Sequence, residues 1–188
     1  MFSVPLQPNR DFPSPAPALS GIWIAVGAIT MSFAAFTSSL IIRQASDDWR
    51  HLALPGILYL NTLVLLASSV TLELARGKNL ANLASTRSWL YLTLLLGVVF
   101  LAGQFLAWHQ LRAQGLYLAT SPNSSFFYVL TVLHALHVLG GLFGLEYVIH
   151  RTNNIPLWRV SAFDAAAVYW HFLAGLWIFL LLVLRTRL

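Results

Sequence analysis

The 188-residue sequence contains no cysteine and very few charged residues. Without cysteine, the chain forms no disulfides, thiolate nucleophiles, cysteine-ligated zinc sites or iron–sulfur clusters. Charged residues make up 9% of the chain and hydrophobic residues 58%, whereas an ordinary soluble domain has roughly 25% charged residues. With a mean hydropathy of +0.72, this composition excludes a soluble fold and indicates a helical membrane protein.

Signature motifs of several enzyme classes are also missing. The sequence has no nucleophile elbow, HExxH motif, P-loop or dinucleotide-binding fingerprint. It also lacks the internal repeat and the pair of interrupted spans that are typical of many transporters. The net charge of +5 comes from basic residues scattered at the ends of apolar runs. This pattern indicates membrane topology and lipid head groups, and we expect no nucleic-acid partner.

Five apolar runs are each long enough to cross a hydrocarbon layer of about 30 Å. Because lipid offers no hydrogen-bond partner to the backbone, each run is predicted to be a helix. The predicted fold is an all-α integral membrane bundle of five transmembrane helices, with no room for a second, soluble domain. The spans are predicted at about residues 20–42, 53–75, 88–111, 125–149 and 160–184.

Prolines mark the predicted boundaries. Residues 1–19 hold five of the eight prolines and are predicted to form an extended N-terminal tail. Pro55 is expected in the first turn of the second helix, where its missing amide proton costs nothing. Pro122 and Pro156 are expected in the connections before the fourth and fifth helices.

The basic residues also predict an orientation. With a cytoplasmic N-terminus, six Lys and Arg residues lie on the inner side and three on the outer side, once the final tail is set aside. This positive-inside bias predicts a cytoplasmic N-terminus and a C-terminus outside. The six inner residues are Arg10, Arg76, Lys78, Arg87, Arg151 and Arg159.

Three carboxylates within the spans then fall near the inner surface. Glu73, Glu146 and Asp164 lie close in predicted depth to basic residues, and we expect charge pairing and contact with lipid head groups there. The alternative is that these carboxylates conduct protons. The basic residues concerned are Arg76, Arg151 and Arg159.

Aromatic and small residues fit the same layout. Trp108 and Tyr128 fall near the outer boundary, where such side chains favour the head-group layer. Gly140 and Gly144 form a GxxxG step on the fourth span. We expect them, together with Gly175 on the fifth span, to provide close contacts between helices.

Polar residues deep in the spans form the candidate site. His134 and His137 lie three residues apart on one helical face, and His171 lies at a similar depth on the fifth span. Two facing imidazoles on different helices could ligate a haem, and a zinc site is a weaker alternative. Hydrogen bonding between helices, alongside Asn61 and Gln104, is the interpretation that the spacing favours.

Four segments carry a family resemblance. They are LNTLVLLASSVT from Leu60, FLAGQFLAWHQL from Phe100, SFFYVLTVLHALHVLGGL from Ser125 and FDAAAVYWHFLAGLWIF from Phe163. In this order, they resemble subunit III of the haem–copper oxidases, the family of cytochrome c and quinol oxidase subunit 3. The five-span length is similar to the short bacterial form, which lacks two leading helices.

The resemblance implies a non-catalytic subunit of a terminal respiratory oxidase that reduces oxygen and pumps protons. It implies no catalytic, cofactor-binding or metal-binding residue in this chain, because the haems and copper belong to subunits I and II. His134, His137 and His171 match structural positions of the family. The implied partners are mainly subunit I, then subunit II, further small subunits or a supercomplex, and phospholipids, in a bacterial plasma membrane.

The sequence departs from the family at three acidic positions. A glutamate common in the first span falls at Ile29, a third-span glutamate at Ala107, and a fifth-span aspartate at Ala174. In contrast, Asp164 retains an acidic side chain at the position of the glutamate in the family's FEAAA segment. The losses favour a scaffold or lipid-holding role over proton conduction. They leave as alternatives an accessory subunit of a nitric oxide reductase or divergent oxidase and, in another class, a haem-b-binding membrane cytochrome.

Overall fold

The computed structural model describes residues 17–45, 49, 54–77, 83–151 and 156–187, and it describes their side chains except at 17–18, 83–84, 151 and 156–161. Arg10, Lys78 and the predicted tail up to residue 16 lie outside the described residues. The described chain forms five helices, and each contains a segment long and apolar enough to cross a membrane. This confirms the predicted fold class. The helices are α1 (Pro17–Arg43), α2 (Ile57–Gly77), α3 (Leu83–Ala113), α4 (Pro122–Arg151) and α5 (Pro156–Arg187).

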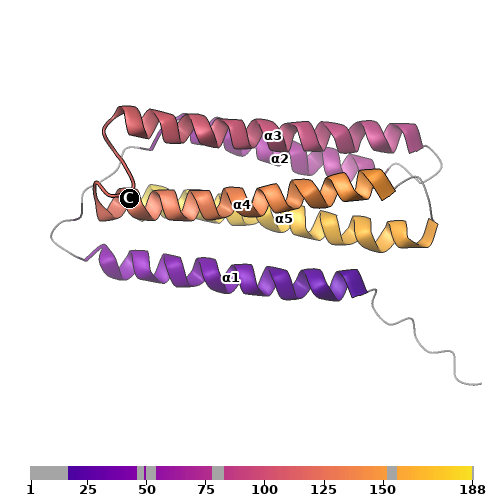
Figure 1. Ribbon diagram of the computed structural model, residues 1–188, viewed down its shortest axis with the longest axis horizontal. Coiled ribbons are helices and arrows are strands. Elements are labelled where there is room, and N and C mark those ends of the chain that lie inside the picture. The colour runs from indigo at the N-terminus through magenta and orange to yellow at the C-terminus, as the bar shows by residue number, and fades with distance from the viewer. Residues whose placement is uncertain (1–16, 46–48, 50–53, 78–82, 152–155, 188) are drawn as a thin grey trace, which may run out of the picture.

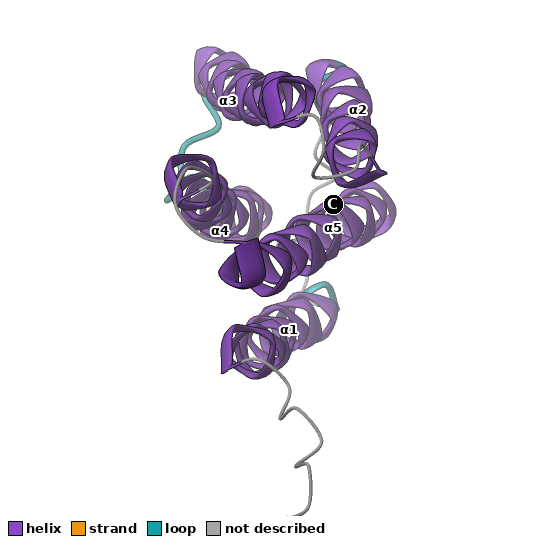
Figure 2. Cartoon of the chain, turned by 90° about the vertical axis from the view of Figure 1, so that its right-hand side faces the viewer, coloured by secondary structure: helices purple, strands orange, loops and turns teal. Residues whose placement is uncertain are grey.

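Four of the helices form a closed core (Figure 2). In it, α2 packs on α3, α3 on α4, α4 on α5, and α5 back on α2; we call this arrangement the four-helix core. Helix α1 lies outside it, against α5 and α4. In an apolar stretch of 18 residues in α1, only 11% of the stretch is buried, against 50% in the corresponding stretches of α4 and of α5. Most of the α1 surface is therefore left for lipid or another protein.

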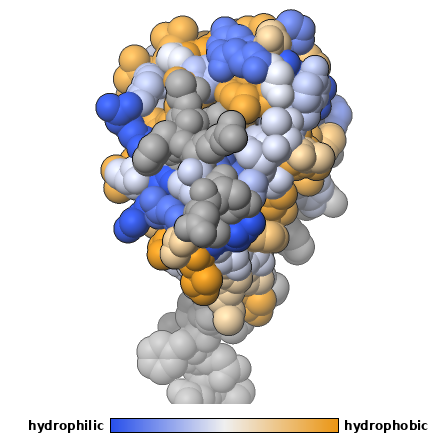
Figure 3. All heavy atoms as spheres, turned by 90° about the vertical axis from the view of Figure 1, so that its left-hand side faces the viewer, coloured by the Kyte–Doolittle hydropathy of each residue, from blue (hydrophilic) through white to orange (hydrophobic). Residues whose placement is uncertain are grey.

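The helices run along the long axis of the molecule, so the bundle has two ends (Figure 1). Helices α2 and α4 finish at the Arg76 end, and α1 and α3 finish at the Arg112 end. Figure 3 views the Arg112 end, where hydrophilic residues gather on the end face and apolar residues cover the flanks. This distribution fits a bundle that crosses a membrane along its long axis.

The prolines lie differently from the prediction. Helix α2 begins at Ile57, and the Leu58 amide donates to the Pro55 carbonyl at 3.1 Å, so Pro55 belongs to a turn before the helix. Pro122 and Pro156 are the first residues of α4 and α5 and not part of the connections. Proline suits a first helical position because its fixed φ matches the helix and no hydrogen bond is lost.

Candidate functional site

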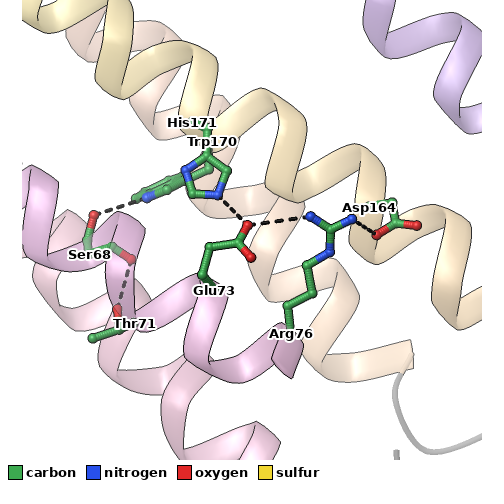
Figure 4. Close-up of polar contacts among 7 residues, drawn as sticks. All are labelled: Ser68, Thr71, Glu73, Arg76, Asp164, Trp170 and His171. Carbon is green, nitrogen blue, oxygen red and sulfur yellow. Dashed lines mark hydrogen bonds and ion pairs between the residues drawn. The ribbon is translucent and has the colours of Figure 1, made fainter. Parts of the chain in front are cut away.

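Trp170 on α5 contacts every helix of the four-helix core. Its indole N–H donates to Ser68 Oγ on α2 at 3.0 Å (Figure 4), and the side chain is almost fully buried. Its ring lies against two glycines. A Cβ at Gly97 of α3 would approach it to 2.8 Å and one at Gly141 of α4 to 3.1 Å. Both helices therefore come close because these positions carry no side chain.

Two further tryptophans make the same kind of contact. The Trp177 N–H of α5 donates to Thr62 Oγ1 of α2 at 2.9 Å, and the Trp108 N–H of α3 donates to Thr131 Oγ1 of α4 at 3.0 Å. Each accepting hydroxyl, including Ser68, itself donates to a carbonyl three or four residues earlier, at 2.7–2.8 Å. The hydroxyls thus keep their partners within a medium that offers none.

For two aromatic residues, the structure adds contacts that the sequence did not predict. Trp108 is half-buried between α3 and α4 and is not only a head-group anchor. Tyr128 is buried, and its hydroxyl donates to the Leu116 carbonyl in the α3–α4 connection at 2.8 Å. Sequence reasoning did not assign the roles of Trp170 and Trp177. A tryptophan and a hydroxyl residue at matching depth on two spans is the signal that could have indicated them.

Asn61 joins α2 to α3. Its amide Nδ2 donates to the Phe100 carbonyl at 2.8 Å, and its side chain is buried. Gly103 lies directly against that amide, because a Cβ there would overlap Asn61 Oδ1. Further along the same helix pair, the hydroxyls of Thr71 and Thr93 lie 2.8 Å apart. Two polar pairs and one glycine thus contribute to the α2–α3 contact.

The three deep histidines have three different environments. His134 is fully buried, with its ring centroid 5.1 Å from Trp177 and 5.9 Å from Phe100. His137 donates from Nδ1 to the carbonyl of the residue four positions earlier, at 2.7 Å, and lies near Phe33 of α1. His171 faces α2, where its Nε2 lies 2.8 Å from Glu73 Oε1.

The structure therefore does not bring these histidines together as a facing pair. The arrangement considered for haem requires His171 to point toward His134 or His137, but its imidazole is bonded to Glu73. Within the described part of the chain, no group of three or more His, Asp or Glu residues could hold a metal ion. Gln104 and His134 are both fully buried, and their polar side-chain atoms have no hydrogen-bond partner among the described residues. The predicted hydrogen bonding between helices is therefore wrong for these two side chains.

Charged residues meet at the Arg76 end of α2 and α5 (Figure 4). The Arg76 guanidinium lies 2.9 Å from Asp164 Oδ1 on α5 and 3.5 Å from Glu73 Oε1 on its own helix. Together with His171, these residues form a network that we call the Glu73 cluster. Glu146 lies exposed on α4. The side chains of Arg151 and Arg159 lie outside the described residues.

The predicted close contacts at the GxxxG step are wrong. A Cβ at Gly144 or Gly175 would meet nothing within 4 Å, and one at Gly140 only the Tyr169 hydroxyl at 3.8 Å. The close contact occurs at the neighbouring Gly141, against Trp170. The GxxxG residues instead border an apolar groove of about 390 Å³ between α1, α4 and α5. Its lining residues are Ile22, Ala25, Gly140, Gly141, Gly144, Tyr147, Val148, Ala162, Ala165, Ala166 and Tyr169.

Comparison with known proteins places this bundle of membrane helices in a class. The family model of cytochrome c oxidase subunit III matches residues 48–186. The chain is 30% identical to cytochrome c oxidase subunit 3 of Alkalihalophilus pseudofirmus, across 96% of this chain and 91% of that protein. It is 34% identical to the Synechocystis sp. protein of that name, across 79% of this chain and 66% of the relative. A probable subunit 3 of Nocardia farcinica is 35% identical across 62% of this chain and 59% of the relative.

These matches define the chain first as an integral membrane subunit of an oxidoreductase complex. More particularly, it belongs to the cytochrome c oxidase subunit III family, the third subunit of the haem–copper oxidases. The resemblance carried by the four sequence segments is thereby confirmed.

Proposed function

We propose that this chain is a catalytically inactive scaffold that stabilises oxidase subunit I. Subunit II, and further small subunits or a supercomplex, complete the assembly, and the haems and copper lie in the partner chains. The assembly lies in a bacterial plasma membrane, with the N-terminus of this chain in the cytoplasm and its C-terminus outside. Because the donor site lies on other subunits, the proposal covers complexes fed by cytochrome c and by quinol alike.

This proposal rests on one observation: polar side chains inside the spans form hydrogen bonds from one helix to another. The indole N–H groups of the core and the Asn61 amide bond one helix to the next. The positions where relatives often have carboxylates carry Ile29, Ala107 and Ala174, all of them buried. These three positions therefore offer no carboxylate that could carry a proton through the spans. The interior of this chain is thus suited to holding helices together.

Phospholipid is the second proposed partner. The groove bordered by Gly140 and Gly144 has apolar walls that fit acyl chains. Arg151 and Arg159 flank the α4–α5 connection at the Arg76 end, where a guanidinium can bind a lipid phosphate. We propose that acidic phospholipid occupies this groove with its head group at that end.

Co-purification in mild detergent tests the scaffold proposal. A tagged copy of the full chain is expected to bring subunit I, with its haems, in an amount equal to that of the tagged chain. The isolated chain, separated from these partners, is expected to have no haem absorption band. A chain that purifies alone, with a haem band that disappears in His171→Ala, would falsify the proposal in favour of a membrane cytochrome.

Lipid analysis of the purified complex tests the second part. Arg151→Ala combined with Arg159→Ala is expected to reduce the retained acidic phospholipid, whereas Arg112→Ala at the opposite end is expected to leave it unchanged. Gly144→Leu, which fills open space in the groove, is expected to reduce it as well. Equal retention in all four preparations, the unmodified complex included, would refute a lipid site in this groove.

A further inference from the structure

The Glu73 cluster lies on the outer surface of the bundle, where α2 meets α5. The Glu73 side chain is 49% exposed and the His171 side chain 37% exposed, although the two share a hydrogen bond. Arg76 joins Glu73 to Asp164, so the cluster ties the two helices together (Figure 4). Its polar atoms nevertheless face away from the four-helix core.

Part of this cluster lies along the apolar helices, inside their ends. Helix α2 has 21 residues, which span about 31 Å at about 1.5 Å per residue, close to the thickness of a bilayer core. Glu73 lies four residues before the last residue of α2, or about 6 Å inside its end. His171 lies seven residues beyond Asp164, or about 10 Å further along α5. A carboxylate and an imidazole thus lie inside the ends of helices that are long enough to cross a bilayer core.

The surroundings of Glu73 on α2 are apolar. Leu63, Leu66, Val70 and Leu74 are exposed large hydrophobic residues of the same helix, and at helical spacing they form one outward stripe with Glu73. Lipid would suit the leucines and the valine but offers nothing to a half-exposed carboxylate. Within the described part of the chain, Glu73 Oε2 accepts no hydrogen bond. This surface therefore combines the features of a lipid-facing helix with a polar group that lipid cannot solvate.

The exposed carboxylate indicates what covers the cluster. Glu73 Oε1 is held by His171 and Arg76, whereas Oε2 is left as an acceptor with no donor among the described residues. A complementary neighbour would be apolar opposite Val70 and would supply a cation or N–H donor opposite Glu73. A transmembrane helix with one such side chain meets both requirements.

We propose that the α2 stripe from Leu63 to Leu74, with Glu73 in it, is the contact surface for a transmembrane helix of another oxidase subunit. That helix places a Lys, Arg or amide side chain within hydrogen-bonding distance of Glu73. The inference rests on the proposed function, because it requires the chain to sit in a complex. Beyond the proposed function, it specifies which face of this chain contacts the partner and which kind of side chain the partner supplies.

Photo-crosslinking in the intact complex tests the assigned surface. A benzophenone amino acid at Val70 is expected to form an adduct with a membrane-spanning subunit, at a segment with a basic or amide residue within about one helical turn. The same probe at Phe143, which is exposed on α4, gives the background for a helix that does not contact α2. Adducts with lipid alone at Val70 would overturn the proposal.

Replacement of the carboxylate tests the assigned chemistry. Glu73→Gln keeps a partner for His171 but removes the charge, and we expect this chain to dissociate from the complex about tenfold faster in detergent. Glu146→Gln, a matched change of an exposed glutamate on α4, is expected to leave the dissociation rate unchanged. Equal rates for the two variants would contradict the proposal, provided that both isolated chains melt like the unmodified chain.

Failure of this inference is distinguishable from failure of the proposed function. If the tagged chain brings down the other subunits but Val70 labels only lipid, the scaffold proposal stands and the assigned face is wrong. If the chain brings down no oxidase subunit, both are wrong.

Discussion

Trp170 links all four helices of the core through a single side chain. Its N–H reaches Ser68 on α2, while its ring occupies the space left by Gly97 on α3 and Gly141 on α4. Hydrogen bonds between membrane helices contribute about 0.6 kcal/mol on average and at most about 1.7 kcal/mol. The bond to Ser68 is therefore a modest part of what Trp170 provides, and close packing supplies the rest.

The first prediction concerns a change that removes the hydrogen bond from Trp170 to Ser68 but keeps most of the aromatic ring. Trp170→Phe is expected to lower the free energy of unfolding by about 1–3 kcal/mol, since it removes the N–H bond to Ser68 and leaves a small cavity. Thermal unfolding in detergent, followed by circular dichroism, measures this. Trp23→Phe, on the exposed face of α1, is the control and should leave the midpoint unchanged. Equal midpoints for the two variants would show that Trp170 is not a packing centre.

Gly103 gives a second prediction at this scale. Gly103→Ala is expected to destabilise the chain by about 1–3 kcal/mol, because the new methyl group overlaps the buried Asn61 amide. Gly144→Ala, which adds the same group in open space, should be neutral. Combining Gly103→Ala with Asn61→Ala should cost less than the sum of the two single changes. Strict additivity in the unfolding measurements would count against this contact.

At the scale of helices, side-chain pairs join α2 to α5 along most of their length. Thr62 and Ser68 accept the two indole N–H groups inside the core. Near the Arg112 end, the Arg185 guanidinium donates to the Tyr59 hydroxyl at 2.8 Å, and the Glu73 cluster lies near the other end. This series closes the four-helix core without any contribution from α1.

The position of α1 outside that core leads to a third prediction. A chain that lacks residues 1–45 is expected to keep α2–α5 folded, because every polar pair between core helices is retained. Its helical signal should fall only by the share of α1, and Trp170 should stay protected from aqueous quenchers. Loss of most of the helical signal, or quenching of Trp170, would mean that α1 is part of the core.

The sequence predicted the helices but not their neighbours. Length and hydropathy fix where a span can form, and the five spans were found in this way. They do not fix which face of a span meets which helix, because these helices are apolar on all sides. The sequence therefore allows His171 to face His134, whereas the structure pairs it with Glu73. For the same reason, the GxxxG step drew attention to Gly140, although Gly141 makes the close contact.

At the scale of the whole molecule, the chain has large exposed apolar surfaces and a core held by close packing together with hydrogen bonds between helices. The family match at residues 48–186 makes it a subunit of an oxidase complex. The exposed surfaces of α1 and of the α2 stripe are therefore available for other subunits and for lipid. The chain is expected to act through these contacts and not through a reactive centre of its own.

Turnover of the oxidase complex with and without this chain is the most direct test of that claim. Complexes lacking the chain are expected to keep the haem content of subunit I and the initial rate of oxygen consumption. They are expected to inactivate after fewer turnovers, because subunit I has lost its neighbour. Loss of haem or of the initial rate on removal of the chain, or an unchanged number of turnovers, would contradict the account.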